Sequence, residues 1–426
     1  MAPTGRSWSA GAMLALLSIA AVASATGDPA CGGLPFAAGV CSGKGGEADL
    51  VTPNTGTLKA TEKVGAQPLP PVAVGFQDAN GNDRSSGRKG DVVVAQDGSG
   101  NFRTVQAAIN AAPVKSTKRF VIFIKPGRYT EKVTVPSNKP FITLRGSGPY
   151  RTVISWGDRA STLLKTTKKP MGTFLSASVG VNADYFTAED ITFQNHASRP
   201  RPNSFTEQAV AFRITGDFAA FHNVRFYGYQ DTLYCHRGRH LFKNVYVRGS
   251  VDFIFGNGRS MFLDSLLFAD VTKTGGALTA QKRDSTKEPT GFVFIRCKVQ
   301  GTGQVYLGRA WGRAARTIFA YTYMDNVILP VGWNDWFDPT RQETIFYAEY
   351  RCSGPGARRG QRARWSFGLT DKQVQPFLST NFIDGKKWLG KTGIPGLRDV
   401  GTKQSGTMPT NAPPPPQNPK RLRLFM

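Results

Sequence analysis

Phe221-His222-Asn223-Val224-Arg225-Phe226 is followed by Phe242-Lys243-Asn244-Val245-Tyr246-Val247 and by Phe262-Leu263-Asp264-Ser265-Leu266-Leu267, so similar segments follow one another at a nearly constant interval. Further segments of this kind start at Ala188, before the series, and at Phe294, after it, each separated from its neighbour by a longer interval. A period of about 20 residues, with insertions, is typical of a coil of short strands in which each repeat is one turn of the coil.

The rest of the 426-residue sequence agrees with many short strands, because its 47 glycines and 27 prolines supply frequent turns. We therefore predict an all-β protein, a right-handed parallel β-helix. A helix over residues 105–112, capped by Thr104 and ended by Pro113, is expected to cover its N-terminal edge. A β-sandwich is the alternative, although it does not favour strand–turn units of one length.

The ends of the sequence differ in composition from the middle. Arg6, an apolar run over residues 11–22 and Ala23-Ser24-Ala25 have the layout of a cleaved secretory signal, and the run is too short for a membrane span. We predict a signal peptide over 1–25, a flexible Gly/Pro-rich prelude over 26–88, a catalytic β-helix over 89–400 and a basic Pro-rich tail over 401–426. An uncleaved anchor is the alternative for residues 1–25.

The net charge is +25, from 54 Lys and Arg against 29 Asp and Glu. Such a surface attracts polyanions. Export makes chromosomal DNA a poor candidate and favours an extracellular acidic polymer. Cys31 and Cys41 could pair in an oxidising compartment, while Cys235, Cys297 and Cys352 are far apart in sequence and show no metal-site spacing.

Two aspartates mark the candidate site. The separation of Asp231 and Asp252 equals that of Phe221 and Phe242, which is one repeat. In a β-helix the two aspartates would project from neighbouring strands about 4.8 Å apart. Two carboxyls that close cannot both ionise freely, so one becomes an acid and the other a nucleophile or base. Two unrelated turn aspartates are the alternative.

Five segments in order resemble the signature blocks of plant pectin methylesterases (pectinesterases). They begin at Gly127-Arg128-Tyr129, Gln208-Ala209-Val210, Gly228-Tyr229-Gln230, Gly249-Ser250-Val251 and Leu307-Gly308-Arg309, and the similarity runs from about Val92 to Trp388. The resemblance implies a right-handed parallel β-helix that hydrolyses the methyl ester at C6 of galacturonate in homogalacturonan, without a metal or organic cofactor. It also implies a member without the helical inhibitor-like pro-region.

The resemblance also implies roles for single residues. Asp252 matches the nucleophile and Asp231 the proton donor and acceptor, while the amides of Gln208 and Gln230 match the pair that stabilises the oxyanion. Arg309 matches the partner of the nucleophile. Ser178, Trp311 and Trp333 match positions that contact the substrate; core packing is the alternative for Trp333, and an ordinary strand residue is the alternative for Gln208.

Several positions depart from the family pattern. Ser178 stands where a Thr is usual, and Ala310 replaces a common Pro. Val245 and Ser265 occupy the positions of two cysteines that form a disulfide in many plant members, so that bridge is expected to be absent as a whole. No role is evident for Cys235.

The sequence thus predicts a secreted, monomeric pectinesterase of the cell wall that acts on an acidic polysaccharide, does not bind nucleic acid or membranes, and has a pectinesterase inhibitor protein as a candidate partner. A silent pectin-binding β-helix is disfavoured because all five polar site residues are present. A pectate lyase would need clustered acidic calcium ligands, and a polygalacturonase would need carboxylates around a glycosidic bond.

Overall fold

The computed structural model describes residues 90–201, 204, 206–394 and 397. The chain divides into two compact units, residues 1–69 and 70–426, and all described residues belong to the second. The predicted signal peptide (1–25), prelude (26–88) and tail (401–426) lie outside the described residues.

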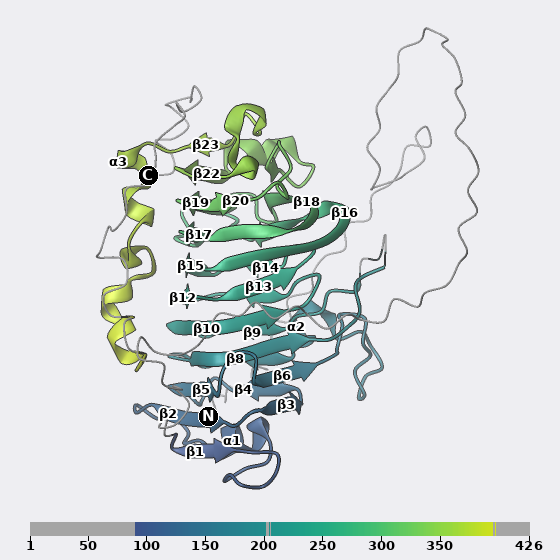
Figure 1. Cartoon of the computed structure of the whole chain (residues 1–426), viewed down its shortest axis with the longest axis vertical. Coiled ribbons are helices and arrows are strands. Elements are labelled where there is room, and N and C mark those ends of the chain that lie inside the picture. Colours follow the sequence, from purple (N-terminus) through teal and green to yellow (C-terminus); the bar gives the residue numbers. More distant parts are fainter. Residues whose placement is uncertain (1–89, 202–203, 205, 395–396, 398–426) are drawn as a thin grey trace, which may run out of the picture. The chain divides into compact units, whose positions relative to one another are not determined.

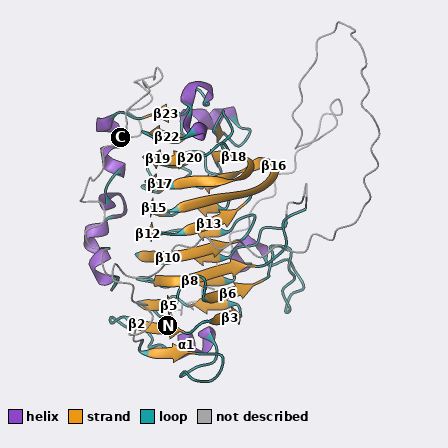
Figure 2. Ribbon diagram, in the orientation of Figure 1, coloured by secondary structure: helices purple, strands orange, loops and turns teal. Residues whose placement is uncertain are grey.

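The described residues form 23 strands joined into one sheet, and every strand pair in it is parallel (Figures 1 and 2). The sheet is wound into successive coils, and each coil contributes strands to three columns. Within a column, a strand pairs with the equivalent strands of the coils before and after it. This is the parallel β-helix that the repeat and the family resemblance predicted.

Six strands belong wholly to the first column: β4 (Val133–Val135), β7 (Val179–Val181), β9 (Phe212–Ile214), β11 (Leu233–Cys235), β14 (Ile254–Gly256) and β21 (Trp333–Asn334). Nine belong to the second: β1 (Val92–Val94), β2 (Phe120–Ile124), β5 (Ile142–Gly146), β12 (Arg239–Lys243), β15 (Arg259–Leu263), β17 (Gly291–Ile295), β19 (Arg316–Ala320), β22 (Phe346–Tyr350) and β23 (Phe367–Gly368).

The third column contains β3 (Gly127–Thr130), β6 (Thr152–Trp156), β13 (Tyr246–Gly249) and β20 (Tyr323–Met324). Four longer strands pass from one column into the next. These are β8 (Thr187–Asn195) and β10 (Ala219–Tyr227), from the second to the third, and β16 (Leu266–Gln281) and β18 (Lys298–Arg309), from the third to the first.

The repeat seen in the sequence is the register of the second column. Phe221 pairs with Phe242, Phe242 with Phe262, Phe262 with Phe294, and Phe294 with Phe319. Neighbouring rings of this ladder stack with centroids 4.4–4.6 Å apart. Each ring is fully buried, so the ladder forms a continuous apolar core that holds the coils in one register.

The bend between the second and third columns recurs in the same conformation. The residue at this bend has a positive φ of 45–54° in seven consecutive coils. Asn and Asp adopt this left-handed conformation more readily than other non-glycine residues, which explains their place in the repeated segments. The residues are Asp190, Asn223, Asn244, Asp264, Arg296, Tyr321 and Arg351.

A short helix closes the N-terminal end of the β-helix, as predicted. Helix α1 (Val105–Ala111) has Thr104 as its N-cap, and the Glu131 carboxylate accepts the backbone N–H groups of Val105 and Gln106 at 2.8 and 2.9 Å. Its apolar face packs on the first coil, because Val105 and Ile109 are fully buried in the same core as the first strands. Helix α2 (Gly172–Leu175) is one turn long and lies before β7.

The C-terminal segment covers the outer face of the second column (Figure 1). It consists of α3 (Asp371–Val374) and the 3₁₀ helices η4 (Gln375–Phe377), η5 (Thr380–Ile383), η6 (Gly385–Lys387) and η7 (Leu389–Lys391). Its buried Trp388 and Phe382 pack among strand side chains such as Leu241 and Met261. The remaining short helices are η1 (Pro339–Glu343), η2 (Pro355–Ala357) and η3 (Arg359–Gln361).

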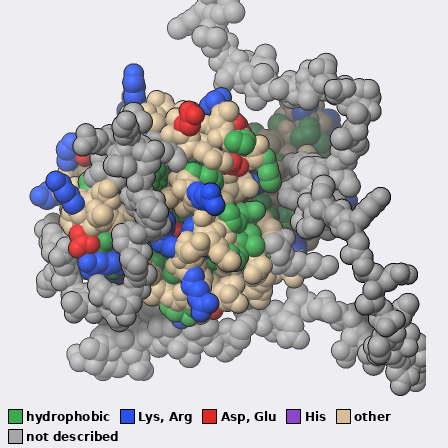
Figure 3. Space-filling view, turned by 90° about the horizontal axis from the view of Figure 1, so that it is seen from above, with side chains coloured by type: hydrophobic (Ala, Val, Ile, Leu, Met, Phe, Trp, Pro, Cys, Tyr) green, Lys and Arg blue, Asp and Glu red, His purple; other side chains and the backbone are tan. Residues whose placement is uncertain are grey.

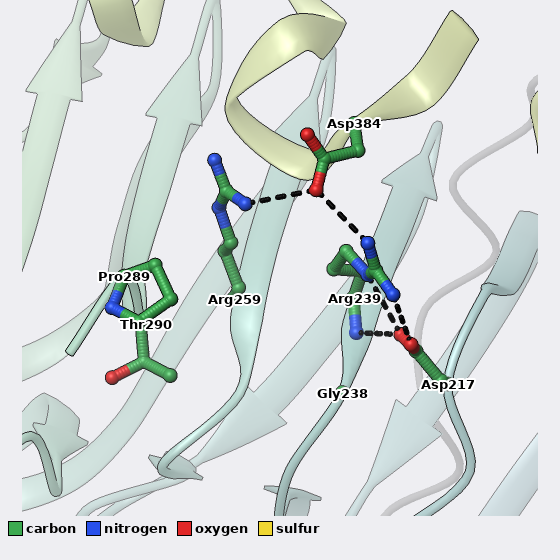
Figure 4. Close-up of a pocket in the computed structure, with 7 residues that line it drawn as sticks. All are labelled: Asp217, Gly238, Arg239, Arg259, Pro289, Thr290 and Asp384. Atoms are coloured by element: carbon green, nitrogen blue, oxygen red, sulfur yellow. Dashed lines mark hydrogen bonds and ion pairs between the residues drawn. The ribbon is translucent and has the colours of Figure 1, made fainter. Parts of the chain in front are cut away.

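Charged side chains fasten this segment beside a cavity of about 290 Å³ (Figure 4). Asp384 accepts bonds from Arg239 at 2.9 Å and from Arg259 at 3.0 Å, so one carboxylate joins two neighbouring coils. Arg239 also binds both carboxylate oxygens of Asp217. Because these charges satisfy one another, the cavity walls are braced and the segment is tied to the strands.

A hydrogen bond joins Val245 and Ser265, the two positions at which the family resemblance implied that a disulfide is absent. The Ser265 hydroxyl accepts the backbone N–H of Val245 at 3.2 Å and donates to the Leu263 carbonyl at 2.8 Å. Cys235, Cys297 and Cys352 are free thiols. The Ser265 hydroxyl thus supplies a hydrogen bond where two cysteines would supply a covalent link.

Candidate active site

Asp231 and Asp252 occupy equivalent positions in neighbouring coils, each two residues before a strand of the first column. Leu233 pairs with Ile254, Gln230 forms a bridge with Val251, and the Asp231 N–H donates to the Val251 carbonyl at 3.0 Å. Both aspartates have positive φ, 64° and 48°, and both are buried, with 8% and 5% of their surface exposed. A separation of one repeat therefore places two buried carboxyls side by side.

Arg309 holds the Asp252 carboxylate from the end of β18. Its Nε donates to Oδ1 and Oδ2 of Asp252 at 2.7 and 2.9 Å, and its Nη2 donates to Oδ2. The indole of Trp336 lies 4.2 Å from the guanidinium carbon. Burial lowers the pKa of Arg309, but the Asp252 charge outweighs it and the pKa is raised overall. Arg309 thus stays charged, and its planar pair of donors orients the Asp252 carboxylate.

Asp231 has the opposite electrostatic character. Burial raises its pKa well above the usual value, the Asp252 charge raises it further, and the Arg309 charge opposes both. Among the described residues, no side chain donates a hydrogen bond to the Asp231 carboxyl group. The two carboxyls therefore meet different environments, because Asp252 accepts charge-assisted hydrogen bonds from Arg309 while burial and the Asp252 charge raise the pKa of Asp231.

The two candidate oxyanion glutamines lie at the same turn in adjacent coils. The Ala209 N–H donates to the Gln230 carbonyl at 3.1 Å, and the Gln208 carbonyl accepts from the Ala160 N–H at 2.8 Å. Both glutamines are partly exposed, whereas Ala209 and Val210 are buried. Their backbones are thus anchored beside Asp231 while part of each residue is open to solvent.

Aromatic rings extend from the carboxyl pair across several coils. Tyr234 and Phe255 stack with centroids 4.1 Å apart, Phe255 lies 6.1 Å from Trp311, and Phe174 lies 6.3 Å from Tyr234. Phe174 is 37% exposed and Trp311 is partly exposed. The Lys282 ammonium lies 5.6 Å from the Trp311 ring. Phe174 and Trp311 are thus open enough to present an apolar face to a sugar, while the buried Tyr234 and Phe255 pack behind them, and the cation suits an acidic sugar.

The family model for Pectinesterase matches residues 91–386 of this chain. The chain belongs to the pectinesterase family. It is an enzyme, a carboxylic ester hydrolase that removes methyl esters from pectin.

Relatives of this pectinesterase include Pectinesterase QRT1 of Arabidopsis thaliana, 45% identical over 314 residues, which are 73% of this chain and 82% of that protein. Probable pectinesterase 8 of the same plant is 45% identical over 70% of this chain and 75% of its own length. Among solved structures, the pectin methylesterase from carrot is 36% identical, with a TM-score of 0.66, and covers 72% of this chain and 97% of its own. A pectin methylesterase in complex with a hexasaccharide is 28% identical, with a TM-score of 0.60, over 70% of this chain and 98% of its own.

Two predicted substrate contacts of the pectinesterase need correction. Trp333 is 1% exposed; its ring stacks on Tyr347 at 4.4 Å and its Nε1 donates to Glu349 at 3.3 Å. Ser178 is wholly buried, with its hydroxyl 3.4 Å from the Trp156 carbonyl oxygen to which it donates. A residue without exposed surface cannot contact a bound sugar, so Trp333 is a core residue, the alternative considered for it, and Ser178 packs inside the coil.

Sequence reasoning overlooked Trp336, Tyr234, Phe255 and Phe174 of the pectinesterase. Tyr234 pairs with Phe255, and each follows a candidate catalytic aspartate by three residues. The repeat that aligned Asp231 with Asp252 therefore aligned these two rings as well, and this signal was present in the sequence. No comparable signal exists for Trp336, because its position over Arg309 depends on a loop outside the repeat.

The described part of the chain contains no group of three or more His, Cys, Asp or Glu residues arranged to hold a metal ion. No helix among the described residues of the pectinesterase is long and apolar enough to cross a membrane.

Proposed function

We propose that this pectinesterase hydrolyses the C6 methyl esters of homogalacturonan through Asp252 as nucleophile and Asp231 as general acid and then general base. The observation that carries the proposal is the bidentate contact of Arg309 with Asp252, next to a buried Asp231 with a raised pKa. This arrangement supplies an ionised nucleophile and a proton donor at one ester bond.

In the first half of the reaction, a carboxylate oxygen of Asp252 attacks the ester carbonyl carbon. The amide N–H groups of Gln208 and Gln230 stabilise the negative oxygen of the tetrahedral intermediate without adding a charge beside Asp252. The carbon–oxygen bond to the methoxy group then breaks, and Asp231 gives its proton to that oxygen, so that methanol leaves. An acyl-enzyme anhydride with Asp252 remains.

In the second half, water takes the place of methanol. Asp231, now ionised, accepts a proton from the water as the oxygen attacks the same carbonyl carbon. Collapse of the second tetrahedral intermediate breaks the bond to Asp252, releases galacturonic acid and restores the starting protonation of both aspartates. The released acid then gives its proton to solvent and becomes the galacturonate carboxylate.

Methanol release from highly methylated pectin tests the proposal, with Asp252→Asn and Asp231→Asn as variants. Asn is nearly isosteric with Asp and tolerates the positive φ at both positions, so both variants are expected to keep the fold. Each is expected to lose roughly 10²–10⁴-fold in turnover, the range for an acid–base or nucleophilic group. A folded variant that kept more than about a tenth of wild-type turnover would refute the assigned roles.

We also propose that the enzyme acts outside the cell, on cell-wall pectin. The candidate signal at residues 1–25 and the basic character of the chain, net charge +25, support this proposal. Lys and Arg side chains are spread over the face drawn in Figure 3. N-terminal sequencing of the secreted protein should find Thr26 as its first residue, whereas retention of residues 1–25 would contradict cleavage.

A monomeric state and recognition by a pectinesterase inhibitor protein are further proposals, which follow from the family. Light scattering after gel filtration should give the mass of one chain. Addition of a pectinesterase inhibitor protein should abolish methanol release and yield a one-to-one complex. Unchanged activity in an excess of this inhibitor would contradict its role as a partner.

A further inference from the structure

Among the described residues, the strands of the third column present a row of partly exposed side chains on a different column from Asp231 and Asp252. Side chains alternate along its strands: Val224 and Phe226 of β10 are fully buried, whereas Arg225 and Tyr227 are partly exposed. The same alternation occurs in β13, where Tyr246 and Arg248 point outward. The C-terminal segment covers the second column, not this one. We call this surface the third-column face; it comprises the outward residues from β3 to β20.

The third-column face is strongly one-sided in charge. Strand pairing aligns its outward residues in two rows that start on β3 and run through β6, β8, β10, β13, β16 and β18. One row continues to Tyr323 on β20, and the other ends at Gln300 on β18, beyond which Asp325 follows β20. Four positions in these rows carry cations and none carries a carboxylate. The cations are Arg128, Arg225, Arg248 and Lys298.

Three of these cations have no recorded ion pair with a carboxylate among the described residues. Arg128 donates to the Gln194 amide oxygen at 2.8 Å, and Arg225 donates to the hydroxyls of Tyr227 and Tyr150. The Lys298 ammonium lies 5.5 Å from the Tyr323 ring. Arg248 alone is neutralised, by Asp270 at the margin of the face. The face therefore keeps an excess of positive charge.

Aromatic rings accompany the cations. The Arg225 guanidinium lies 3.8 Å from the Tyr150 ring and 4.9 Å from the Tyr246 ring, and Tyr246 lies 5.2 Å from Tyr227. Tyr150 and Tyr323 are 47% and 38% exposed. Successive coils are about 4.8 Å apart, so Arg128 and Lys298, six coils apart, span roughly 29 Å. An extended chain with a negative charge on each ring complements such a strip.

We infer that the third-column face binds de-esterified homogalacturonan, a polyuronate, at a site separate from the carboxyl pair. This inference rests on the proposed function, because it takes the product of that reaction as the ligand. The cations attract the carboxylates and the tyrosines contact the sugar rings. The enzyme is thereby held on chains that it has already demethylated, near methyl esters that remain.

The test compares two variants with equal loss of charge. Arg128→Gln/Lys298→Gln removes two exposed cations from the face and leaves Arg225 with its tyrosines. Lys118→Gln/Lys372→Gln is the matched control, because both lysines are exposed and lie outside the face. Affinity for fully de-esterified polygalacturonate in low salt should fall roughly three- to tenfold in the first variant and much less in the control, the range for two exposed charges.

Substrate length separates this site from the active site. On a methylated trigalacturonide, too short to reach both sites, the first variant should match the wild type in methanol release. On long, partly de-esterified pectin it should show a raised KM with an unchanged kcat. Loss of activity on the trigalacturonide in the wild type would contradict the proposed function and not this inference.

Other outcomes overturn the inference. Equal affinity of the two double variants for polygalacturonate would show that the face is not a binding site. If dextran sulfate, which has no uronate carboxylates, bound the face as tightly as polygalacturonate, the site would be a general polyanion surface. Tyr323→Ala adds a third arm: its loss of affinity should persist at high salt, because ring contacts are not screened.

Discussion

At the scale of single residues, the site divides two chemically identical side chains into different roles. The Arg309 guanidinium donates to both carboxylate oxygens of Asp252. Asp231 is instead buried beside the negative charge of Asp252. Their backbone environments are almost the same, since both precede a first-column strand with positive φ. The difference between the two carboxyls therefore comes from the Arg309 side chain that a later coil brings to Asp252.

The Arg309 contact gives a test that separates catalysis from sugar binding. Arg309→Lys keeps the charge but loses the planar pair of donors that aligns Asp252. We expect a large fall in kcat and a smaller change in KM, the pattern of an interaction needed mainly in the transition state. Steady-state kinetics on methylated pectin measures both; a raised KM with kcat nearly kept would make Arg309 a substrate-binding residue instead.

The raised pKa of Asp231 predicts a cost in stability. The folded-state pKa lies above the unfolded value of 3.8, so the unfolded chain releases this proton first as pH rises. Stability is thus lost from about pH 3.8 up through the folded pKa. Asp231→Asn cannot ionise, and we expect its melting temperature to exceed that of the wild type near neutral pH.

Thermal unfolding of both proteins across the pH range measures this effect. The difference in melting temperature between the variant and the wild type should be small in acid. It should grow toward neutral pH, because Asp231 then ionises in the unfolded wild-type chain. A difference that stayed constant with pH would show that the carboxyl group is not held protonated by burial.

At the scale of elements, each coil takes its strand register from the coil on which it stacks. The phenylalanine ladder and the positive-φ bends repeat at the same positions, so one coil templates the register of the next. The loops between strands are free to differ, and they carry the site: Trp336 lies on one, and Gln208 and Gln230 lie at turns. The regular columns thus align Asp231, Asp252 and Arg309, while the loops add residues such as Trp336 around them.

Val245 and Ser265 allow the missing disulfide to be restored. They lie in register on adjacent coils, where backbones are about 4.8 Å apart and within the range that a disulfide spans. Val245→Cys with Ser265→Cys should form a bridge and stabilise the fold by about 3 kcal/mol, because it closes a loop of roughly 20 residues. Melting temperatures with and without reductant, together with a free-thiol count, measure this.

Ser265→Cys alone is the control for that variant. Cys297 lies on the next coil, with the Lys298 N–H donating to the Ser265 carbonyl at 2.8 Å, so Cys297 is the adjacent cysteine with which the single variant could form a bridge. Peptide mapping distinguishes the two bridges. A double variant with the same melting temperature in both redox states and all thiols free would contradict the expected register.

At the scale of the whole molecule, two histidines with lowered pKa values link stability to pH. His240 is fully buried between the Ser260 hydroxyl, 2.9 Å from its Nδ1, and the Gly216 carbonyl, and burial lowers its pKa from 6.5 to about 4. Burial and the charges of Arg213 and Arg237 lower the pKa of His236 to about 4 as well. Both side chains are therefore neutral in the folded protein in mild acid.

We expect the free energy of unfolding to fall as pH drops from 6.5 to about 4. In this window the unfolded chain takes up protons that the folded protein cannot bind, and full stability returns above pH 6.5. The contribution of His240 is on the order of 3 kcal/mol. His240→Gln should flatten the dependence of the denaturation midpoint on pH; an unchanged slope would contradict this role.

The sequence by itself determined the β-helix architecture and the pairing of the two aspartates, Asp231 and Asp252. The regular repeat placed the phenylalanines in one ladder and Asp231 beside Asp252, and the signature segments indicated Arg309 as the partner that the structure then placed on Asp252. The ladder and the aspartate pair follow from spacing, because in a β-helix residues one repeat apart must become neighbours, whereas Arg309 was implied by the family resemblance.

Only the tertiary structure decided which side chains reach solvent and how the site is charged. It buried Trp333 and Ser178, placed Trp336 on Arg309, raised the pKa of Asp231 and left the third-column face open. The exposure of a side chain and the pKa of a carboxyl group depend on whether loops and segments distant in sequence cover the coil on which it lies. A local repeat does not reveal which coils are covered. Strands with the same pattern are buried under the C-terminal segment in the second column and keep partly exposed side chains in the third column.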